Sequence, residues 1–123
     1  MTVFAQDSVA DAVSIFDQQR FHHLPVLDET KQLCGMITDR DVMRFMIIHG
    51  RSRLAKTPIQ QVMTKKIITA AESTEIRSIA NVMCQQGFSA MPITEANHTL
   101  MGVVTRSDIL RTLVNEAPLE LWV

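Results

Sequence analysis

Cysteine is scarce in this chain of 123 residues, which holds only Cys34 and Cys84. The two lie far apart in apolar surroundings, so the sequence predicts reduced core residues rather than a disulfide. The four histidines are also few, and they do not stand at the spacing of a metal-binding motif. No metal site is therefore expected.

An excess of charge of one sign is absent as well. Twelve basic and thirteen acidic side chains nearly cancel, which argues against sequence-independent binding to nucleic acid. The apolar runs are too short to span a bilayer, and residues 1–13 lack the pattern of a signal peptide. With 46% hydrophobic and 20% charged residues, we expect a compact, soluble, cytoplasmic domain.

The sequence does contain an internal repeat with a period of 67 residues. Residues 7–46 align with residues 74–113 without a gap. Nine aligned pairs are identical: Gln18/Gln85, Gln19/Gln86, Phe21/Phe88, Pro25/Pro92, Leu33/Leu100, Gly35/Gly102, Thr38/Thr105, Asp41/Asp108 and Arg44/Arg111. Each copy opens with apolar residues at the i, i+3, i+4, i+7 spacing of an amphipathic helix, and Ser8 and Ser73 are candidate N-caps.

Two short apolar stretches follow that helix in each copy, and a second helix follows them. The first stretch contains a proline, Pro25 or Pro92, which favours an edge or the first part of a strand. Each copy is thus a helix–strand–strand–helix unit, too small to bury a good core alone. We expect an α+β fold in which two pseudo-symmetric units pack sheet to sheet, with two equivalent clefts between them.

Domain boundaries follow from the repeat. The first repeat is expected at residues 1–50, a basic connector and lead-in at 51–66, and the second repeat with a C-terminal tail at 67–123, opened by a strand at Ile67 to Ala70. The counterpart of residues 58–66 would fall before residue 1. The first repeat therefore lacks its lead-in, as in a piece of a longer protein whose output domain is missing.

The C-terminal tail carries apolar residues that need cover, which are Leu119, Leu121, Trp122 and Val123. A homodimer contact is the prediction, and folding back on the domain is the simpler alternative.

Both copies contain the phrase G-x-x-T-x-x-D, as GMITDRD and GVVTRSD. Its members are Gly35, Thr38 and Asp41 in the first copy and Gly102, Thr105 and Asp108 in the second. The T-x-x-D part is typical of a capping box at a helix start. The same helix start is also an anion site, and a strand glycine marks close approach of a backbone or a ligand. Spacing alone leaves both interpretations open.

The repeated pattern resembles the cystathionine β-synthase (CBS) domain, which occurs in tandem as a Bateman module. The matching stretches are FHHLPVLD with LCGMITDRDVMRF, FSAMPITE with LMGVVTRSDILRTL, and PIQQVMTKK, which is similar to the V-M-T lead-in of such repeats. The resemblance covers nearly the whole chain. It implies a regulatory module that binds AMP, ADP or ATP, or S-adenosylmethionine, in the clefts between the repeats.

Site residues follow from the resemblance by position. Asp41 and Asp108 would hold ribose hydroxyls, and Thr38 and Thr105 would contact phosphate or ribose. Adenine would lie among strand residues, which are Val26, Ile37, Ile93, Val104, Thr69 and Ala71. The apolar members of this set are core residues in the first place, and contact with adenine is a second role.

His22 and His23 match a basic pair that reaches phosphate in the AMP-sensing kinase subunit of this family. The second copy has Ser-Ala at residues 89–90, so the two clefts should differ in affinity or in preferred phosphate number. Because neighbouring strand residues point to opposite sides, at most one histidine is expected in a cleft, and a surface pair without a role is the alternative. Arg40 and Arg106 are further phosphate candidates, with solvated surface as the simpler interpretation.

Two other functional classes are alternatives to the sensor. An enzyme is not expected, because no nucleophile has an adjacent base and the repeat puts Asp41 and Asp108 in different clefts. The second hypothesis is a pure assembly module with empty clefts, in which the helices serve dimerisation or docking. The stretch VMRFMII and Trp122 are compatible with it.

Overall fold

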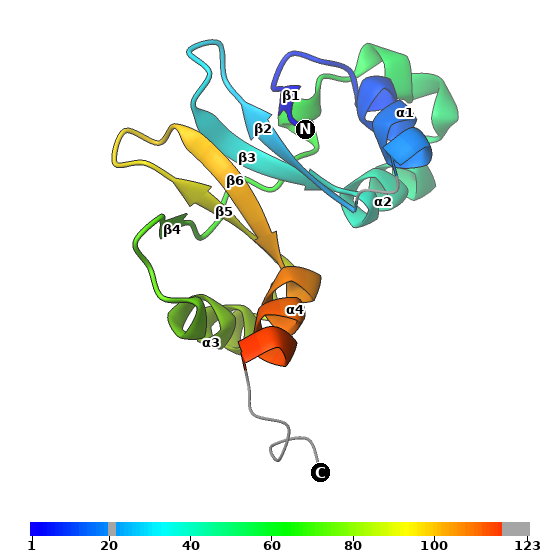
Figure 1. The fold of residues 1–123 in the computed structure, drawn as a ribbon. Helices are drawn as coiled ribbons and strands as arrows, with labels where there is room; N and C mark the ends of the chain where they lie inside the picture. Colours follow the sequence, from blue (N-terminus) through cyan, green and yellow to red (C-terminus); the bar gives the residue numbers. More distant parts are fainter. Residues whose placement is uncertain (20–21, 117–123) are drawn as a thin grey trace.

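A computed structural model describes residues 1–19 and 22–116 of the chain. Two three-stranded sheets lie between two pairs of helices (Figure 1). The first repeat contains β1 (Val3–Phe4), α1 (Val9–Gln19), β2 (His23–Leu27), β3 (Leu33–Thr38) and α2 (Asp39–His49). The second contains β4 (Ala70–Ala71), α3 (Ile76–Gln86), β5 (Ala90–Thr94), β6 (Leu100–Thr105) and α4 (Arg106–Glu116). Every bound in the second repeat is the matching bound in the first plus 67, which confirms the predicted α+β fold of two equivalent units.

Within each sheet the middle strand pairs with one parallel and one antiparallel neighbour. The orders are β1-β2-β3 and β4-β5-β6. Pro25 lies inside the middle strand β2, not at an edge of the sheet. Its missing N–H is tolerated because β1 pairs only with Val26 and Leu27, so at Pro25 the strand has a partner, Met36, on one side alone.

The two hairpin loops meet at the pseudo-twofold axis that the repeat predicts. Gln32 and Thr99, which are equivalent residues, form an isolated antiparallel bridge. The Leu33 N–H donates to the His98 carbonyl at 3.1 Å. Lys31 and His98 are equivalent too, and both have left-handed backbones, with φ of 65° and 68°. Because equivalent residues can pair with each other only near a twofold axis, the axis passes through these loops.

The lead-in after the connector packs on the first repeat. The connector and lead-in form two 3-10 helices, η1 (Arg51–Lys56) and η2 (Ile59–Gln61). Ile59 is fully buried in the first core. The next residues continue along the free edge of β3, where Thr64 and Met36 exchange backbone hydrogen bonds of 2.8 and 3.0 Å. Residues 58–64 therefore complete the first unit, although the sequence assigned them to the opening of the second.

Each sheet has its own hydrophobic core with its helices. The first core is the larger; Val9, Leu24, Val26 and Ile37 are fully buried in it. The second has fewer buried members, which are Ile79, Met83, Met91 and Ile109.

Several local predictions need correction. The strand expected at Ile67 to Ala70 is β4, at Ala70–Ala71. Ser8 does cap its helix, accepting from the Asp11 N–H at 3.1 Å, but Glu75 rather than Ser73 is the N-cap of α3. Cys34 packs against the first core, whereas Cys84 is exposed, on a part of α3 that faces solvent.

The apolar tail, Leu119 to Val123, lies outside the described residues. No helix in the described part of the chain has the length and apolar character to cross a membrane.

Candidate functional site

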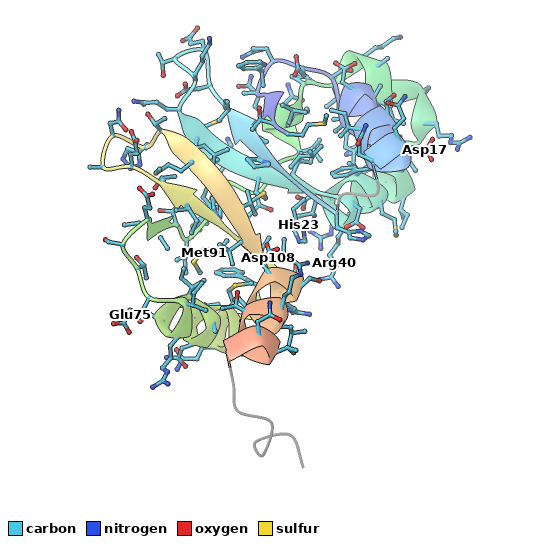
Figure 2. All side chains as sticks on the ribbon, in the orientation of Figure 1. Asp17, His23, Arg40, Glu75, Met91 and Asp108 are labelled. Atoms are coloured by element: carbon cyan, nitrogen blue, oxygen red, sulfur yellow. The ribbon has the colours of Figure 1, made fainter. Side chains whose placement is uncertain are left out.

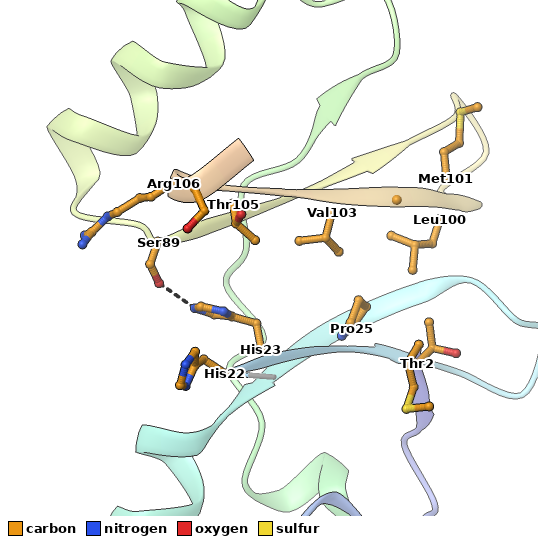
Figure 3. A pocket seen from close by; sticks show the side chains of 13 residues that line it. Thr2, His22, His23, Pro25, Ser89, Leu100, Met101, Val103, Thr105 and Arg106 are labelled. Atoms are coloured by element: carbon orange, nitrogen blue, oxygen red, sulfur yellow. Dashed lines mark hydrogen bonds between the residues drawn. The ribbon is translucent and has the colours of Figure 1, made fainter. Parts of the chain in front are cut away.

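Two hollows lie between the repeats, and they are unequal. The larger cleft, with a volume of about 690 Å³, runs between β2 and β6 to the start of α4 (Figure 3). The smaller cleft, of about 230 Å³, lies between β3, β5 and residues 64–68. The larger falls within the roughly 300–1,000 Å³ usual for small-molecule sites, and the smaller falls below it. The two clefts predicted from the repeat are thus present but not equivalent.

The larger cleft changes character along its length (Figure 3). One end is polar and basic, with His22, His23 and Arg106. The middle has apolar walls, Pro25 on β2 and Val103 on β6. Further lining residues are Met1, Thr2, Ser89, Leu100, Met101, Gly102, Thr105 and Ser107.

The polar end includes the start of helix α4. Thr105 lines the cleft, and its hydroxyl and backbone N–H donate to Asp108 Oδ2 at 2.9 and 2.8 Å. The Asp108 N–H donates back to the Thr105 hydroxyl at 3.3 Å, and Arg111 lies 3.3 Å from Oδ1. The hydrogen bonds from Thr105 lower the pKa of Asp108, and Arg111 adds to the effect. Asp108 lies in the first turn of α4 (Figure 2) and does not itself line the cleft.

The equivalent helix start in the first repeat is also a capping box. Thr38 accepts from the Asp41 N–H, and Asp41 accepts from the Thr38 N–H, both at 3.0 Å. The Thr64 hydroxyl lies 3.4 Å from the nearer Asp41 oxygen. Thr38 lines the smaller cleft and Asp41 does not. The capping interpretation is therefore correct for both copies, while a carboxylate, with about four acceptor sites, keeps capacity for a further donor.

The two motif glycines have different surroundings. A Cβ on Gly35 would lie 2.6 Å from Met63 Sδ and 3.0 Å from the Thr64 carbonyl oxygen. At Gly35 the close neighbour is thus the lead-in segment. Among the described residues, no atom lies within 4 Å of a Cβ built on Gly102, which lines the larger cleft.

The predicted apolar contacts are out of register by one residue. Val26 and Ile37 are buried in the first core, and Ile93 and Val104 pack against the second. Strand alternation turns their neighbours toward the clefts instead. These neighbours are Pro25, Met36, Pro92 and Val103.

Both predicted histidines line the larger cleft, contrary to the expectation that at most one could. His22 precedes β2, so strand alternation does not apply to it. Its Nδ1 lies 2.9 Å from Asp39 Oδ2. His23 is half-buried, and burial lowers its pKa; nearby Asp39 acts in the opposite direction, while His22 and Arg106 add to the lowering.

Three further predicted residues line neither cleft. Arg40 and Thr69 are exposed and line neither. Ala71 lines a separate hollow with Glu72 and Glu95, beside the ends of β4 and β5. Thr69 and Ala71 lie away from the clefts because β4 begins later than predicted and pairs with the last two residues of β5.

Sequence reasoning missed most of the smaller cleft. Its unpredicted lining is Met36, Thr64, Lys66, Ile67, Ile68, Gly87, Phe88, Ser89, Ala90 and Pro92. The repeat offset of 67 relates Met36 to Val103 and Pro92 to Pro25, so those two could have been found from the larger cleft. Within the described chain, no group of three or more His, Cys, Asp or Glu side chains is arranged to hold a metal ion.

Comparison with known proteins gives one family. The family model described as the CBS domain matches residues 1–48 and 59–115. The CBS domain pair of the protein MJ0100, crystallised with 5′-methylthioadenosine and S-adenosyl-L-methionine, is 27% identical with a TM-score of 0.82. That likeness covers 94% of this chain and 89% of the other.

Curated relatives are longer proteins. An L-aspartate semialdehyde sulfurtransferase from Methanocaldococcus jannaschii is 29% identical over 90% of this chain. An inosine-5'-monophosphate dehydrogenase from the same organism is 31% identical, also over 90%. The chain spans 21% of the length of each.

Proposed function

Because this chain belongs to the CBS domain family and carries two repeats, we propose that it is a regulatory module that binds an adenine nucleotide, AMP, ADP or ATP, between the repeats. One observation carries the proposal: the larger cleft joins apolar walls to a basic end at a helix start. An adenosine phosphate has the same division, with an apolar base at one end and an anion at the other.

Each part of the nucleotide has a proposed partner in the larger cleft. Adenine packs between Pro25 and Val103, where the walls are apolar. The phosphate lies at His22, His23 and Arg106, near the positive end of the α4 helix dipole. The ribose lies between them, beside Thr105, with Asp108 accepting from its hydroxyls in addition to capping the helix.

The smaller cleft suits a ligand with less phosphate. At the positions equivalent to His22 and His23 it has Ser89 and Ala90, and Asp39 stands where the other repeat has Arg106. Besides His23, which it shares with the larger cleft, Lys66 is the basic residue among its lining. The MJ0100 pair, whose ligands are adenosine compounds without phosphate, supports an adenosine ligand here, and S-adenosylmethionine is a second candidate.

The module is proposed to act by binding, without catalysis, as part of a larger cytoplasmic assembly. We propose that the repeats comprise residues 1–50 and 67–123 and that residues 51–66 are the connector and lead-in, of which 58–64 pack on the first repeat. A homodimer is favoured by exposed apolar residues at equivalent places on α2 and α4, which are Met43, Ile47, Leu110 and Val114. The same faces support the alternative of a pure assembly module that binds no ligand.

Calorimetric titration with AMP and with adenosine tests the proposal. AMP should bind the larger cleft more tightly than adenosine. Asp108→Ala should remove about 1–3 kcal/mol of AMP binding, by loss of charge-assisted hydrogen bonds. Asp41→Ala is the matched control, since it removes the other capping box and should leave the larger cleft's affinity intact. Equal AMP affinity in wild type and Asp108→Ala would leave the carboxylate only its capping role.

Thermal unfolding separates the sensor from the assembly module. A ligand at a hundred times its Kd stabilises the folded state by about 2.7 kcal/mol. With an unfolding entropy of about 2.1 cal/mol/K per residue, that raises Tm by roughly 10 °C for a chain of 123 residues whose two repeats unfold together. An unchanged Tm with every adenosine compound at millimolar concentration would favour the assembly module.

A further inference from the structure

Within the described chain, two residues line both clefts, and they touch each other. His23 and Ser89 appear in the walls of the larger and of the smaller cleft. His23 Nε2 lies 2.5 Å from Ser89 Oγ, and the dashed line in Figure 3 marks this hydrogen bond. The two residues come from different repeats. The wall that separates the two clefts therefore includes a hydrogen bond between the titratable ring of His23 and the hydroxyl of Ser89.

The short distance favours Ser89 as the donor. Hydrogen bonds donated by a hydroxyl are typically about 2.5–3.0 Å long, whereas those donated by N–H are about 2.7–3.2 Å. A neutral histidine with its proton on Nδ1 has a bare Nε2 that accepts. In this state the single hydroxyl proton of Ser89 points at His23 and is not available to a ligand in the smaller cleft.

Protonation of His23 reverses that hydrogen bond. An imidazolium donates from both nitrogens, so Nε2–H then donates to Ser89 Oγ. Ser89 keeps its hydroxyl proton, but this proton no longer points at His23, and the hydroxyl can rotate so that it donates into the smaller cleft. The proton that His23 gains comes from water, and no other bond changes.

The surroundings of His23 favour its neutral form. Burial lowers its pKa, as do His22 and Arg106, while Asp39 raises it. A phosphate at the basic end of the larger cleft adds negative charge beside the ring and favours the protonated form. An anion in the larger cleft is thus the event that changes the charge on His23.

We propose that the His23–Ser89 pair couples the two clefts, so that an anion bound in the larger cleft strengthens binding of an uncharged adenosine in the smaller one. This coupling rests on the proposed function, since it needs both clefts to bind. Site-to-site couplings typically change affinity by about 5–150-fold. For a single released hydroxyl donor we expect the lower end, about 5-fold.

NMR with methyl-labelled protein tests the coupling at each cleft separately. Ile67 and Ile68 line the smaller cleft, and Leu100 and Met101 line the larger. Adenosine is titrated with and without saturating inorganic phosphate, and its Kd for the smaller cleft is read from the isoleucine methyl shifts. Phosphate should lower that Kd about 5-fold in wild type and leave it unchanged in Ser89→Ala and in His23→Gln.

His22→Gln is the matched control. His22 lines the larger cleft and not the smaller, so its loss should raise the phosphate concentration needed and keep the 5-fold effect at saturation. If the adenosine Kd of the smaller cleft in wild type is the same with and without phosphate, the coupling is overturned and the proposed function stands. The same holds if only the larger-cleft methyls respond to adenosine. No methyl response to adenosine or AMP at either cleft would overturn both.

Discussion

The two equivalent glycines should respond in opposite ways to the same substitution. Gly35→Ala should destabilise the protein, and Gly102→Ala should not. At Gly35 the new Cβ would meet Met63 Sδ at 2.6 Å and the Thr64 carbonyl oxygen at 3.0 Å. The Met63 side chain can turn away, but it packs against the first core. The Thr64 carbonyl is held by the Met36 N–H at 3.0 Å.

The expected magnitude follows from these contacts. Overpacking a close-packed site typically costs about 1–3 kcal/mol. Replacing glycine by alanine returns about 0.4–1 kcal/mol through the reduced entropy of the unfolded chain. Gly35→Ala should therefore lower the free energy of unfolding by about 1–2 kcal/mol. At Gly102 the contact cost is absent, so the free energy of unfolding should stay level or rise slightly.

Urea denaturation of the two variants beside wild type measures the difference. The midpoint should fall for Gly35→Ala without a change in the slope of free energy against urea, because the surface exposed on unfolding is the same. Gly102→Ala serves as the control for the substitution itself. Equal midpoints for the two variants would refute the assignment of Gly35 to close approach of residues 63 and 64.

Two further predictions concern pH and assembly. His23 has a lowered pKa when folded, so the unfolded chain binds more protons below its ordinary pKa of about 6.5. Stability should fall as pH drops through that value, and His23→Gln should flatten this part of the urea-midpoint profile; an unchanged profile would contradict it. Ile47→Glu places a charge on the exposed apolar face of α2 and should convert a dimer into a monomer in sedimentation equilibrium, with Asp17→Glu on α1 as control. A monomeric wild-type protein would contradict the dimer.

The repeat allowed the helices and strands to be predicted, because a pattern that occurs in both copies is stronger evidence than one that occurs once. A helix at Val9–Gln19 and its equivalent at Ile76–Gln86 follow from apolar spacing that occurs twice. The position of Pro25 in a middle strand did not follow, since it depends on where β1 begins: its first residue, Val3, already pairs with Val26. Whether a proline is tolerated is decided by the neighbouring strand, which local sequence does not specify.

Register explains the main error in the site. The apolar residues Val26 and Val104 were expected to contact adenine, but they point into the cores. A strand buried on both sides reads as a continuous apolar run, so its sequence does not tell the two faces apart. To tell which face of a strand lines the cleft, one residue on that strand must be known to line it. The cleft-lining His23 on β2 and Thr105 on β6 are such points.

The inequality of the clefts has two separate sources. One is visible in the sequence, where Arg106 replaces Asp39 and Ser89 replaces His22 at equivalent positions. The other is the packing of residues 58–64 on the first repeat, which fills the space beside Gly35 and leaves Gly102 open within the described chain. Both changes favour an anion in the same cleft. The larger cleft therefore has both the basic residues and the greater volume, although these two properties arise from different parts of the chain. Neither property requires the backbones of the two repeats to differ.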